Sequence, residues 1–116
     1  MIRKHTISVQ HALEGLLWAF SSQPNYRIHF SLSALSLVGG VLLHISYTEW
    51  LIVIVTIMGG LVLETINTAL EKCGDAISEE YNIHIKRAKD CAAGAMFMYA
   101  IGAIVLASII FLPKMF

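Results

Sequence analysis

Apolar side chains recur along the chain in four stretches, and each stretch predicts a helix. Residues 5–20 carry them at helical intervals among polar positions, which is typical of an amphipathic helix at a membrane interface. Residues 28–45, the first half of 49–77 and residues 91–112 are predominantly apolar over about the length that a bilayer requires. The pattern predicts an all-α integral membrane protein with one interfacial helix and three transmembrane helices. For the first stretch, a helix packed on protein is the alternative.

Two breaks separate the first three helices. Pro24 has no amide donor and disfavours a helical conformation in the residue before it, so a second helix is expected to begin near Asn25. Residues 46–50 form a short turn, in which Thr48 is the expected cap of a helix that runs from about Glu49. That helix continues to about residue 77, and its second half is expected to extend beyond the bilayer into the cytoplasm.

The polar segment at residues 78–90 is expected to form a loop before the third span, which Pro113 closes. Basic residues mark the cytoplasmic ends of membrane spans. They precede the first span and lie between the second and third, whereas the turn at residues 46–50 has none. These residues are Arg3, Lys4, Arg27, Lys72, Lys86, Arg87 and Lys89. The N-terminus and the polar segment are therefore expected in the cytoplasm, and the C-terminus on the opposite side.

The composition agrees with a membrane protein of one domain spanning residues 1–116. Of these residues, 57% are hydrophobic and 14% charged, whereas soluble domains are about 45–50% apolar and about 25% charged. The eight basic side chains equal the eight acidic ones, so the net charge gives no argument for a nucleic-acid partner. Glu14 interrupts the apolar part of the N-terminal stretch, which indicates a retained helix and not a signal peptide.

The most informative stretch is residues 61–75, where four polar side chains fall between apolar ones. Glu64, Asn67, Glu71 and Asp75 lie within about 80° of one helix face at about 100° per residue. The stripe begins inside an apolar run, where an ionisable side chain is unfavourable unless it has a partner, a cavity or a function. This face is the candidate functional site.

Carboxylates in this position suit two kinds of chemistry. Mg²⁺ prefers one or two carboxylates together with water and substrate phosphate, which makes Glu71 the candidate metal ligand. Glu64 lies deepest in the apolar run, where the loss of hydration favours proton uptake, so it is the candidate acceptor of a hydroxyl proton. Lys89 and Asp90 begin the third span and could return to this level, where the lysine would face a phosphate. For Glu71 and Asp75, the alternative is that they are only the solvated end of a helix leaving the membrane.

Other polar side chains near the spans have simpler interpretations. His29 and His44 are candidate proton-relay residues, although a hydrogen-bonded interfacial histidine is the simpler interpretation, and His84 is expected in solvent. Tyr26 and Arg27 are candidate contacts for phosphate or lipid headgroups, with interfacial anchoring as the alternative.

Three spans cannot by themselves enclose a polar stripe, because lipid would still reach part of it. Association of identical chains is expected to cover that surface, and small residues would permit close helix approach. They are Gly39, Gly40, Gly59, Gly60, Ala103 and Ala107.

Two motifs resemble the small bacterial diacylglycerol kinase family, which includes the undecaprenol kinases of Gram-positive bacteria. The stretch ETINTALEKCGD, followed by EEY and then by AKDCAAGA, is similar to the family pattern from Glu64 to Ala95. The similarity extends more loosely to ALEGLLWAF, NYRIHF and HISYTEWL, so it covers nearly the whole chain. NYRIH and HISYTEW are more similar to the undecaprenol kinase branch than to the diacylglycerol kinases of Gram-negative bacteria.

The resemblance implies a homotrimeric enzyme of the bacterial inner (plasma) membrane, which transfers the γ-phosphate of ATP to a lipid alcohol with Mg²⁺. Its active sites would lie on the cytoplasmic side and be shared between neighbouring subunits. By position, Glu64 matches the family's catalytic base, Asn67 matches a residue of the catalytic motif, and Glu71 matches a metal-binding carboxylate.

The same resemblance implies a nucleotide site. Asp75 matches a polar residue near the nucleotide, while Lys89 and Asp90 match the pair that contacts its phosphate and its sugar or base. Arg27 is assigned to the same site. Gln23 departs from the family, because many members have an acidic metal ligand four positions before the arginine matched by Arg27. Its amide oxygen can still bind Mg²⁺ but brings no negative charge.

The sequence therefore predicts a lipid kinase that phosphorylates undecaprenol in preference to diacylglycerol. One alternative is a diacylglycerol kinase that makes phosphatidic acid. Another is a non-catalytic membrane protein that senses lipid or nucleotide, which would suit the amide at Gln23 and the lack of a GxxxxGK[ST] phosphate loop. A proton-coupled transporter is disfavoured, because three short spans with one deep carboxylate offer little for alternating access.

Overall fold

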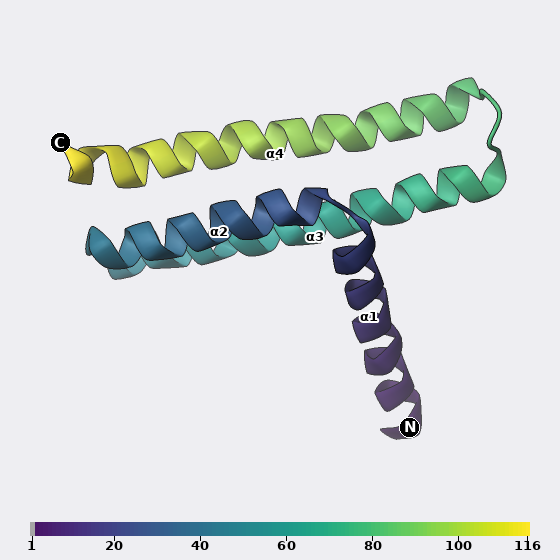
Figure 1. Cartoon of the computed structure of the whole chain (residues 1–116), viewed down its shortest axis with the longest axis horizontal. Helices are drawn as coiled ribbons and strands as arrows, with labels where there is room; N and C mark the ends of the chain where they lie inside the picture. Colours follow the sequence, from purple (N-terminus) through teal and green to yellow (C-terminus); the bar gives the residue numbers. More distant parts are fainter. Residues whose placement is uncertain (1) are drawn as a thin grey trace.

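The computed structural model contains four α-helices in the residues that it describes, 2–116, with side chains described from Lys4 onward. The helices are α1 (Ile2–Ser22), α2 (Asn25–Leu42), α3 (Tyr47–Ile77) and α4 (Ile83–Met115) (Figure 1). Arg3, one of the expected cytoplasmic charges, lies outside the residues whose side chains are described. The prediction of an all-α fold is confirmed.

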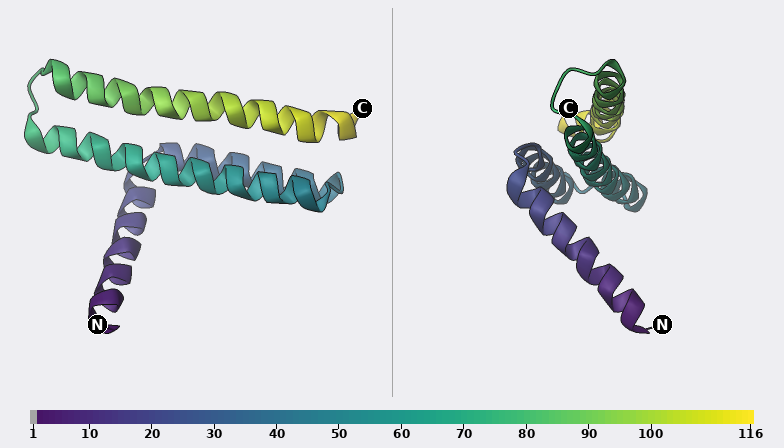
Figure 2. Two further views of the ribbon diagram at one scale, coloured as in Figure 1. Left: turned by 180° about the vertical axis from the view of Figure 1, so that it is seen from behind. Right: turned by 90° about the vertical axis from the view of Figure 1, so that its right-hand side faces the viewer.

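The central helix of the molecule is α3. The flanking helices α2 and α4 both run antiparallel to α3 and pack against it, whereas they make few contacts with each other. The first helix, α1, leaves this arrangement at a steep angle and approaches α3 only near its own C-terminal end (Figures 1 and 2). One long face of α3 is therefore left between two flanking helices.

The break between α1 and α2 falls where the sequence predicts it, with Pro24 just before the first residue of α2 at a φ of −67°. The rings of Phe20 and Tyr26 meet edge to face across the break, with centroids 4.8 Å apart. The ammonium group of Lys72 lies 5.5 Å from the centroid of the Trp18 ring, a cation–π contact between α3 and α1. Most apolar side chains of α1 are exposed, which suits the predicted position at a membrane interface.

The cap of α3 differs from the prediction. Ser46, and not Thr48, is the N-cap: its hydroxyl accepts a hydrogen bond of 3.2 Å from the Glu49 amide, and the Glu49 carboxylate accepts one of 2.9 Å from the Ser46 amide. This reciprocal pair is a capping box, whose sequence signature is a serine followed three residues later by a glutamate. The helix therefore begins at Tyr47, two residues before the predicted start.

The predicted loop at residues 78–90 is wrong for most of its length, because α4 already begins at Ile83. The side chain of Asn82 caps this helix by accepting hydrogen bonds from the backbone amides of His84, at 2.9 Å, and Ile85, at 3.3 Å. An asparagine cap satisfies amides that have no partner in the first turn. The polar residues that follow therefore form the first two turns of α4.

Two predicted helix ends are also displaced. The second helix ends at Leu42, before the predicted end at residue 45, because His44 has a left-handed φ of 51° and the chain turns there. Pro113 does not close the last helix, which runs on to Met115. The fixed φ of proline is compatible with a helix. Because Pro113 lies close to the end of α4, its missing amide costs only one backbone hydrogen bond.

Two helices in the described part of the chain, α3 and α4, are long and apolar enough to cross a membrane. The predicted first span, α2, does not reach that standard, since its first half contains Asn25, Arg27, His29 and two serines. Large apolar side chains are exposed along α2, α3 and α4, as expected where lipid or another subunit covers the surface. The count of three spans stays a prediction.

Two of the glycines predicted to permit association between chains instead serve packing inside this one. A Cβ atom on Gly40 would lie 2.7 Å from Cη2 of Trp50, and one on Gly60 would lie 2.8 Å from the Tyr99 hydroxyl. The absence of a side chain at Gly60 thus lets α4 press the Tyr99 ring onto α3, where its hydroxyl donates to the backbone carbonyl of Thr56.

Candidate active site

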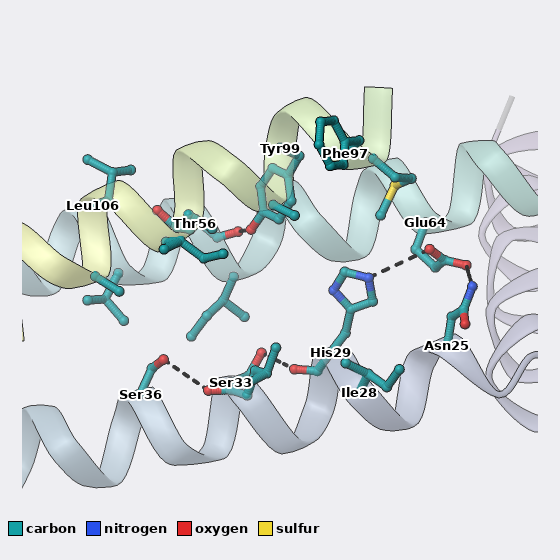
Figure 3. Close-up of a pocket in the computed structure, with 18 of the residues that line it drawn as sticks. Asn25, Ile28, His29, Ser33, Ser36, Thr56, Glu64, Phe97, Tyr99 and Leu106 are labelled. Atoms are coloured by element: carbon teal, nitrogen blue, oxygen red, sulfur yellow. Dashed lines mark hydrogen bonds and ion pairs between the residues drawn. The ribbon is translucent and has the colours of Figure 1, made fainter. Parts of the chain in front are cut away.

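A groove of about 630 Å³ lies over the exposed face of α3. Its walls are α2 and α4, which hardly touch each other, and its lining is mostly apolar (Figure 3). Apolar residues of α3 and α4, such as Val53, Ile110 and Phe111, line one end of the groove. At the other end, the lining includes Glu64 and Glu71. The groove therefore joins an apolar channel to an acidic end.

Glu64 is nearly buried at the polar end of this groove, with 3% of its surface exposed. Its Oε1 atom accepts a hydrogen bond of 3.3 Å from the Asn25 side chain, and its Oε2 atom lies 3.6 Å from Nε2 of His29 (Figure 3). Neither a lysine nor an arginine pairs with it among the described side chains. Among the described side chains, the polar groups that bond or pair with this carboxylate are thus an amide and an imidazole, both contributed by α2.

The stripe predicted on one helix face is confirmed over three of its four members. Glu64, Asn67 and Glu71 all line the groove. The register of α2 against α3 is held nearby by a 2.8 Å hydrogen bond between the hydroxyls of Tyr26 and Thr65. Tyr26 is 1% exposed, so its predicted contact with phosphate or headgroups is wrong. A fully buried phenol bonded to a neighbouring helix serves packing.

The fourth member, Asp75, lies further along α3 and pairs with Lys89 of α4 at 2.7 Å. This contact confirms that Lys89 returns to the level of the acidic stripe. Gly74 permits the approach, since a Cβ atom there would lie 3.1 Å from Ile85 and 3.2 Å from the Lys89 side chain. In this polar part of the helices, beyond their apolar stretches, the hydrogen bond from Lys89 holds the pKa of Asp75 below its usual value. The same hydrogen bond raises the pKa of Lys89.

Two other residues assigned to the nucleotide are not drawn into this cluster. Asp90 forms an ion pair of 2.6 Å with Lys86, one turn earlier in α4. Arg27 is exposed near the start of α2 and has no ion pair with a described side chain. Both remain free to turn toward a ligand, because exposed ion pairs and side chains are only weakly held.

The two predicted metal ligands, Glu71 and Gln23, offer few oxygen atoms to a metal ion. Glu71 is exposed at the groove and has no hydrogen bond or ion pair with a described side chain, so both its oxygens can bind a cation. Gln23 is half-buried at the break between α1 and α2. The described residues contain no group of three His, Cys, Asp or Glu side chains that could hold a metal alone. One carboxylate completed by water and phosphate nevertheless fits the preference of Mg²⁺.

The sequence did not predict the contact of Asn25 with Glu64. No local signal could have found it, because the two residues are 39 positions apart and meet only through the packing of α2 on α3. His29 was considered as a proton relay, and the structure places it in the groove beside Glu64. His44 and His84 are exposed, away from the groove lining.

Comparisons with known proteins bear on the family of this chain. The model of the prokaryotic diacylglycerol kinase family matches residues 10–111. The chain is 34% identical over 108 residues to the undecaprenol kinase of Bacillus subtilis (strain 168), which covers 93% of this chain and 88% of that protein.

A second relative is the diacylglycerol kinase of Synechocystis sp., which is 34% identical over 110 residues. That match covers 94% of this chain but 63% of the relative, so the chain spans less than two thirds of that protein's length. The family predicted from the motifs is thereby confirmed. The chain belongs to the prokaryotic diacylglycerol kinase family of membrane lipid kinases.

Proposed function

We propose that the chain transfers the γ-phosphate of ATP to the hydroxyl of a membrane lipid alcohol, with Mg²⁺, and that undecaprenol is preferred over diacylglycerol. One observation carries the proposal: a nearly buried carboxylate, Glu64, stands at the polar end of an otherwise apolar groove. The apolar part suits a lipid chain, and the acidic part suits chemistry with a metal and phosphate.

The groove matches a lipid alcohol in polarity along its length. Side chains such as Ile57, Phe97 and Ile104 would contact the hydrocarbon chain, whose burial is favourable at about 25 cal/mol per Å². The hydroxyl would then lie near Glu64, where the lining becomes polar. A water-soluble alcohol would gain nothing from this apolar channel, which supports a lipid as the acceptor.

Glu64 would act as the general base. As the lipid oxygen attacks the γ-phosphorus, a new oxygen–phosphorus bond forms, the bond to the β-phosphate oxygen breaks, and ADP leaves. The proton of the lipid hydroxyl passes to Glu64, and Oε2 is the available oxygen because Oε1 already accepts from Asn25. Asn67, which lines the same groove, would orient the hydroxyl or the phosphate.

The nucleotide would lie where α3 and α4 become polar. Lys89 is held there by Asp75 and would contact a phosphate, with Arg27 and Asp90 as further contacts. Glu71 and Gln23 would hold Mg²⁺. When bound, the ion would offset the negative charge of the phosphates, which Glu64 and Glu71 would otherwise repel.

The membrane arrangement belongs to the same proposal. We infer three spans, α2 with α3 and α4, with the N-terminus and the active site on the cytoplasmic side of the bacterial inner membrane. The exposed apolar surfaces of α2, α3 and α4 support assembly with further copies, and a homotrimer would complete sites shared between neighbours.

A competition assay tests the substrate. Purified protein in detergent receives radiolabelled ATP, Mg²⁺ and equal amounts of undecaprenol and diacylglycerol, and the labelled lipids are separated. Faster labelling of undecaprenol is expected, in line with the relative that matches over most of its length. A clear preference for diacylglycerol would overturn the order of the two substrates, and no transfer to either would overturn the proposed reaction.

A further inference from the structure

Of the α2 residues that line the groove, His29 is the titratable one, and it faces the proposed base directly. Its Nε2 atom lies 3.6 Å from Oε2 of Glu64, close enough for a hydrogen bond to form after a small movement. The His29 side chain is 20% exposed, whereas that of Glu64 is 4% exposed. The imidazole is therefore more accessible from the groove than the carboxylate is.

The two oxygens of Glu64 have different surroundings. Oε1 accepts the hydrogen bond from Asn25, which carries no transferable proton at neutral pH. Oε2 lies near His29, which is the titratable described side chain that pairs with it. Glu64 is only 3% exposed, so a proton that it receives has little direct access to water, and the proton must leave before the next turnover can begin.

We propose that His29 is a relay residue that acts through Glu64 and carries this proton out of the site. The inference rests on the proposed role of Glu64 as the base. After phosphate transfer, protonated Glu64 gives its proton to the unprotonated Nε2 of His29, and the carboxylate is restored. The resulting imidazolium loses its Nδ1 proton to water in the groove, and proton exchange with water then returns the neutral ring to the tautomer in which Nε2 carries no proton.

Other groups that face or border the imidazole fit this role. From α3, Glu64 and Glu71 bring negative charge to the same groove, and from α4 the phenol of Tyr99 lines it. On α2 itself, Arg27 is the charged neighbour and is exposed. An imidazole can accept a proton at one ring nitrogen and donate one from the other, which an amide or a hydroxyl in its place could not do.

A purely structural histidine makes a different prediction. It would hold α2 against α3 through its polar contact with Glu64, and the side-chain amide of a glutamine at the same position could make a similar contact. A relay cannot be replaced by an amide, because an amide does not take up a proton at neutral pH. Comparison of His29→Gln with the wild type separates the two roles.

The experiment measures transfer from ATP to the lipid alcohol by the wild type, His29→Gln, His29→Ala and the control His84→Gln, in which an exposed histidine outside the groove receives the same change. We expect kcat to fall at least about tenfold in both His29 variants, while KM for lipid and ATP stays within about twofold. Added imidazole should restore the rate of His29→Ala in proportion to its concentration. The fall of kcat in acid should move to lower pH in His29→Gln, since the wild type needs a neutral imidazole.

Several results would overturn the relay. They are a kcat within about twofold of the wild type in His29→Gln, an equal loss in His84→Gln, or a loss in His29→Ala that imidazole does not restore. Size-exclusion elution and thermal unfolding monitor the fold. Unfolding of both His29 variants would assign His29 to structure instead. Inactivity of the wild type toward both lipids would overturn the proposed reaction itself, whereas normal His29 variants of an active wild type would overturn the relay alone.

Discussion

Two glutamates of α3, one at its start and one in its second half, are held in different ways. Glu49 accepts a 2.9 Å hydrogen bond from the Ser46 amide, and its Oε1 atom lies 3.3 Å from Nζ of Lys114. Its interactions join the start of α3 to the end of α4. Glu64 has instead one amide bond, and its other oxygen faces the imidazole of His29 in a groove. The first carboxylate is committed to structure, and the second keeps one oxygen for a reacting proton.

The difference shows what distinguishes a functional carboxylate in an apolar helix. A glutamate at a helix start has amides to accept from, so its charge is satisfied by the fold. A glutamate in the second half of the same helix has no free backbone amide, and its charge is stabilised only by what neighbouring helices bring. Asn25 donates one hydrogen bond to Glu64, and His29 lies 3.6 Å away. These contacts stabilise the negative charge of Glu64 only in part, so the carboxylate can still take up a proton.

Apart from substitution of Glu64 itself, the largest effect is expected at Glu71, the next carboxylate along the stripe. Glu71→Gln removes the negative charge of the proposed metal ligand, so about 10- to 100-fold more Mg²⁺ should be needed for the half-maximal rate. The measurement is phosphate transfer as a function of Mg²⁺ concentration. Glu79→Gln, an exposed position outside the groove, is the matched control. An unchanged Mg²⁺ dependence in Glu71→Gln would remove Glu71 from the metal site.

In the middle of α3, substitution of one glycine by alanine should lower stability, whereas the same substitution of its neighbour should not. Gly60→Ala places a Cβ atom 2.8 Å from the Tyr99 hydroxyl, and this tyrosine is held by its bond to Thr56, so about 1–3 kcal/mol of stability should be lost. Gly59→Ala meets Tyr99 at 3.5 Å, an ordinary contact, and should be neutral. Thermal unfolding in detergent compares them. Equal unfolding temperatures would show that the ring moves aside freely.

At the Glu49 end, the cap should contribute to stability and not to catalysis. Ser46→Ala removes the hydroxyl that accepts from the Glu49 amide, which should cost about 1 kcal/mol. Thr48→Ala is the matched control, because Thr48 lies inside the helix and forms no cap. Denaturant or thermal unfolding measures both, with phosphate transfer expected to stay near the wild-type rate. A larger loss for Thr48→Ala would contradict the capping box.

The smallest effect is expected at Gln23. Gln23→Glu supplies the carboxylate that many family members have, so the Mg²⁺ requirement should fall a few-fold while the rate at saturating Mg²⁺ changes little, as expected for binding that does not alter the transition state. A Mg²⁺ titration of the variant beside the wild type is sufficient. If the requirement rises or stays the same, Gln23 does not face the metal.

Helix existence and type could be predicted from the sequence, because periodicity and apolar length are local properties. The break at Pro24 follows from proline chemistry, and the acidic face of α3 follows from spacing alone. The helix starts at Tyr47 and Ile83 differ from the predicted starts, because the caps at Ser46 and Asn82 begin each helix earlier than its apolar run does. Both signals are present in the sequence as short cap motifs.

The remaining part of the site depends on how the helices pack. Nothing in the sequence places Asn25 and His29 on Glu64, since both contacts need α2 to lie along α3 in one register. Gly40 and Gly60 likewise pack against side chains of their own chain, and not against another copy as the sequence predicts. Small residues permit close packing, but the sequence does not show which helix is the partner. The family motifs supplied the nucleotide and the lipid, which no side-chain spacing could reveal.

Glu64 serves chemistry and Glu49 serves structure, and one paired measurement distinguishes these two roles. Glu64→Gln and Glu49→Gln are compared for transfer of phosphate from ATP to lipid alcohol, and the same samples are unfolded by heat. Glu64→Gln should lose at least about 100-fold in kcat and unfold near the wild-type temperature, because its amide oxygen still accepts from Asn25. Glu49→Gln should unfold at a lower temperature and keep its rate. Near-normal turnover by Glu64→Gln would contradict the account.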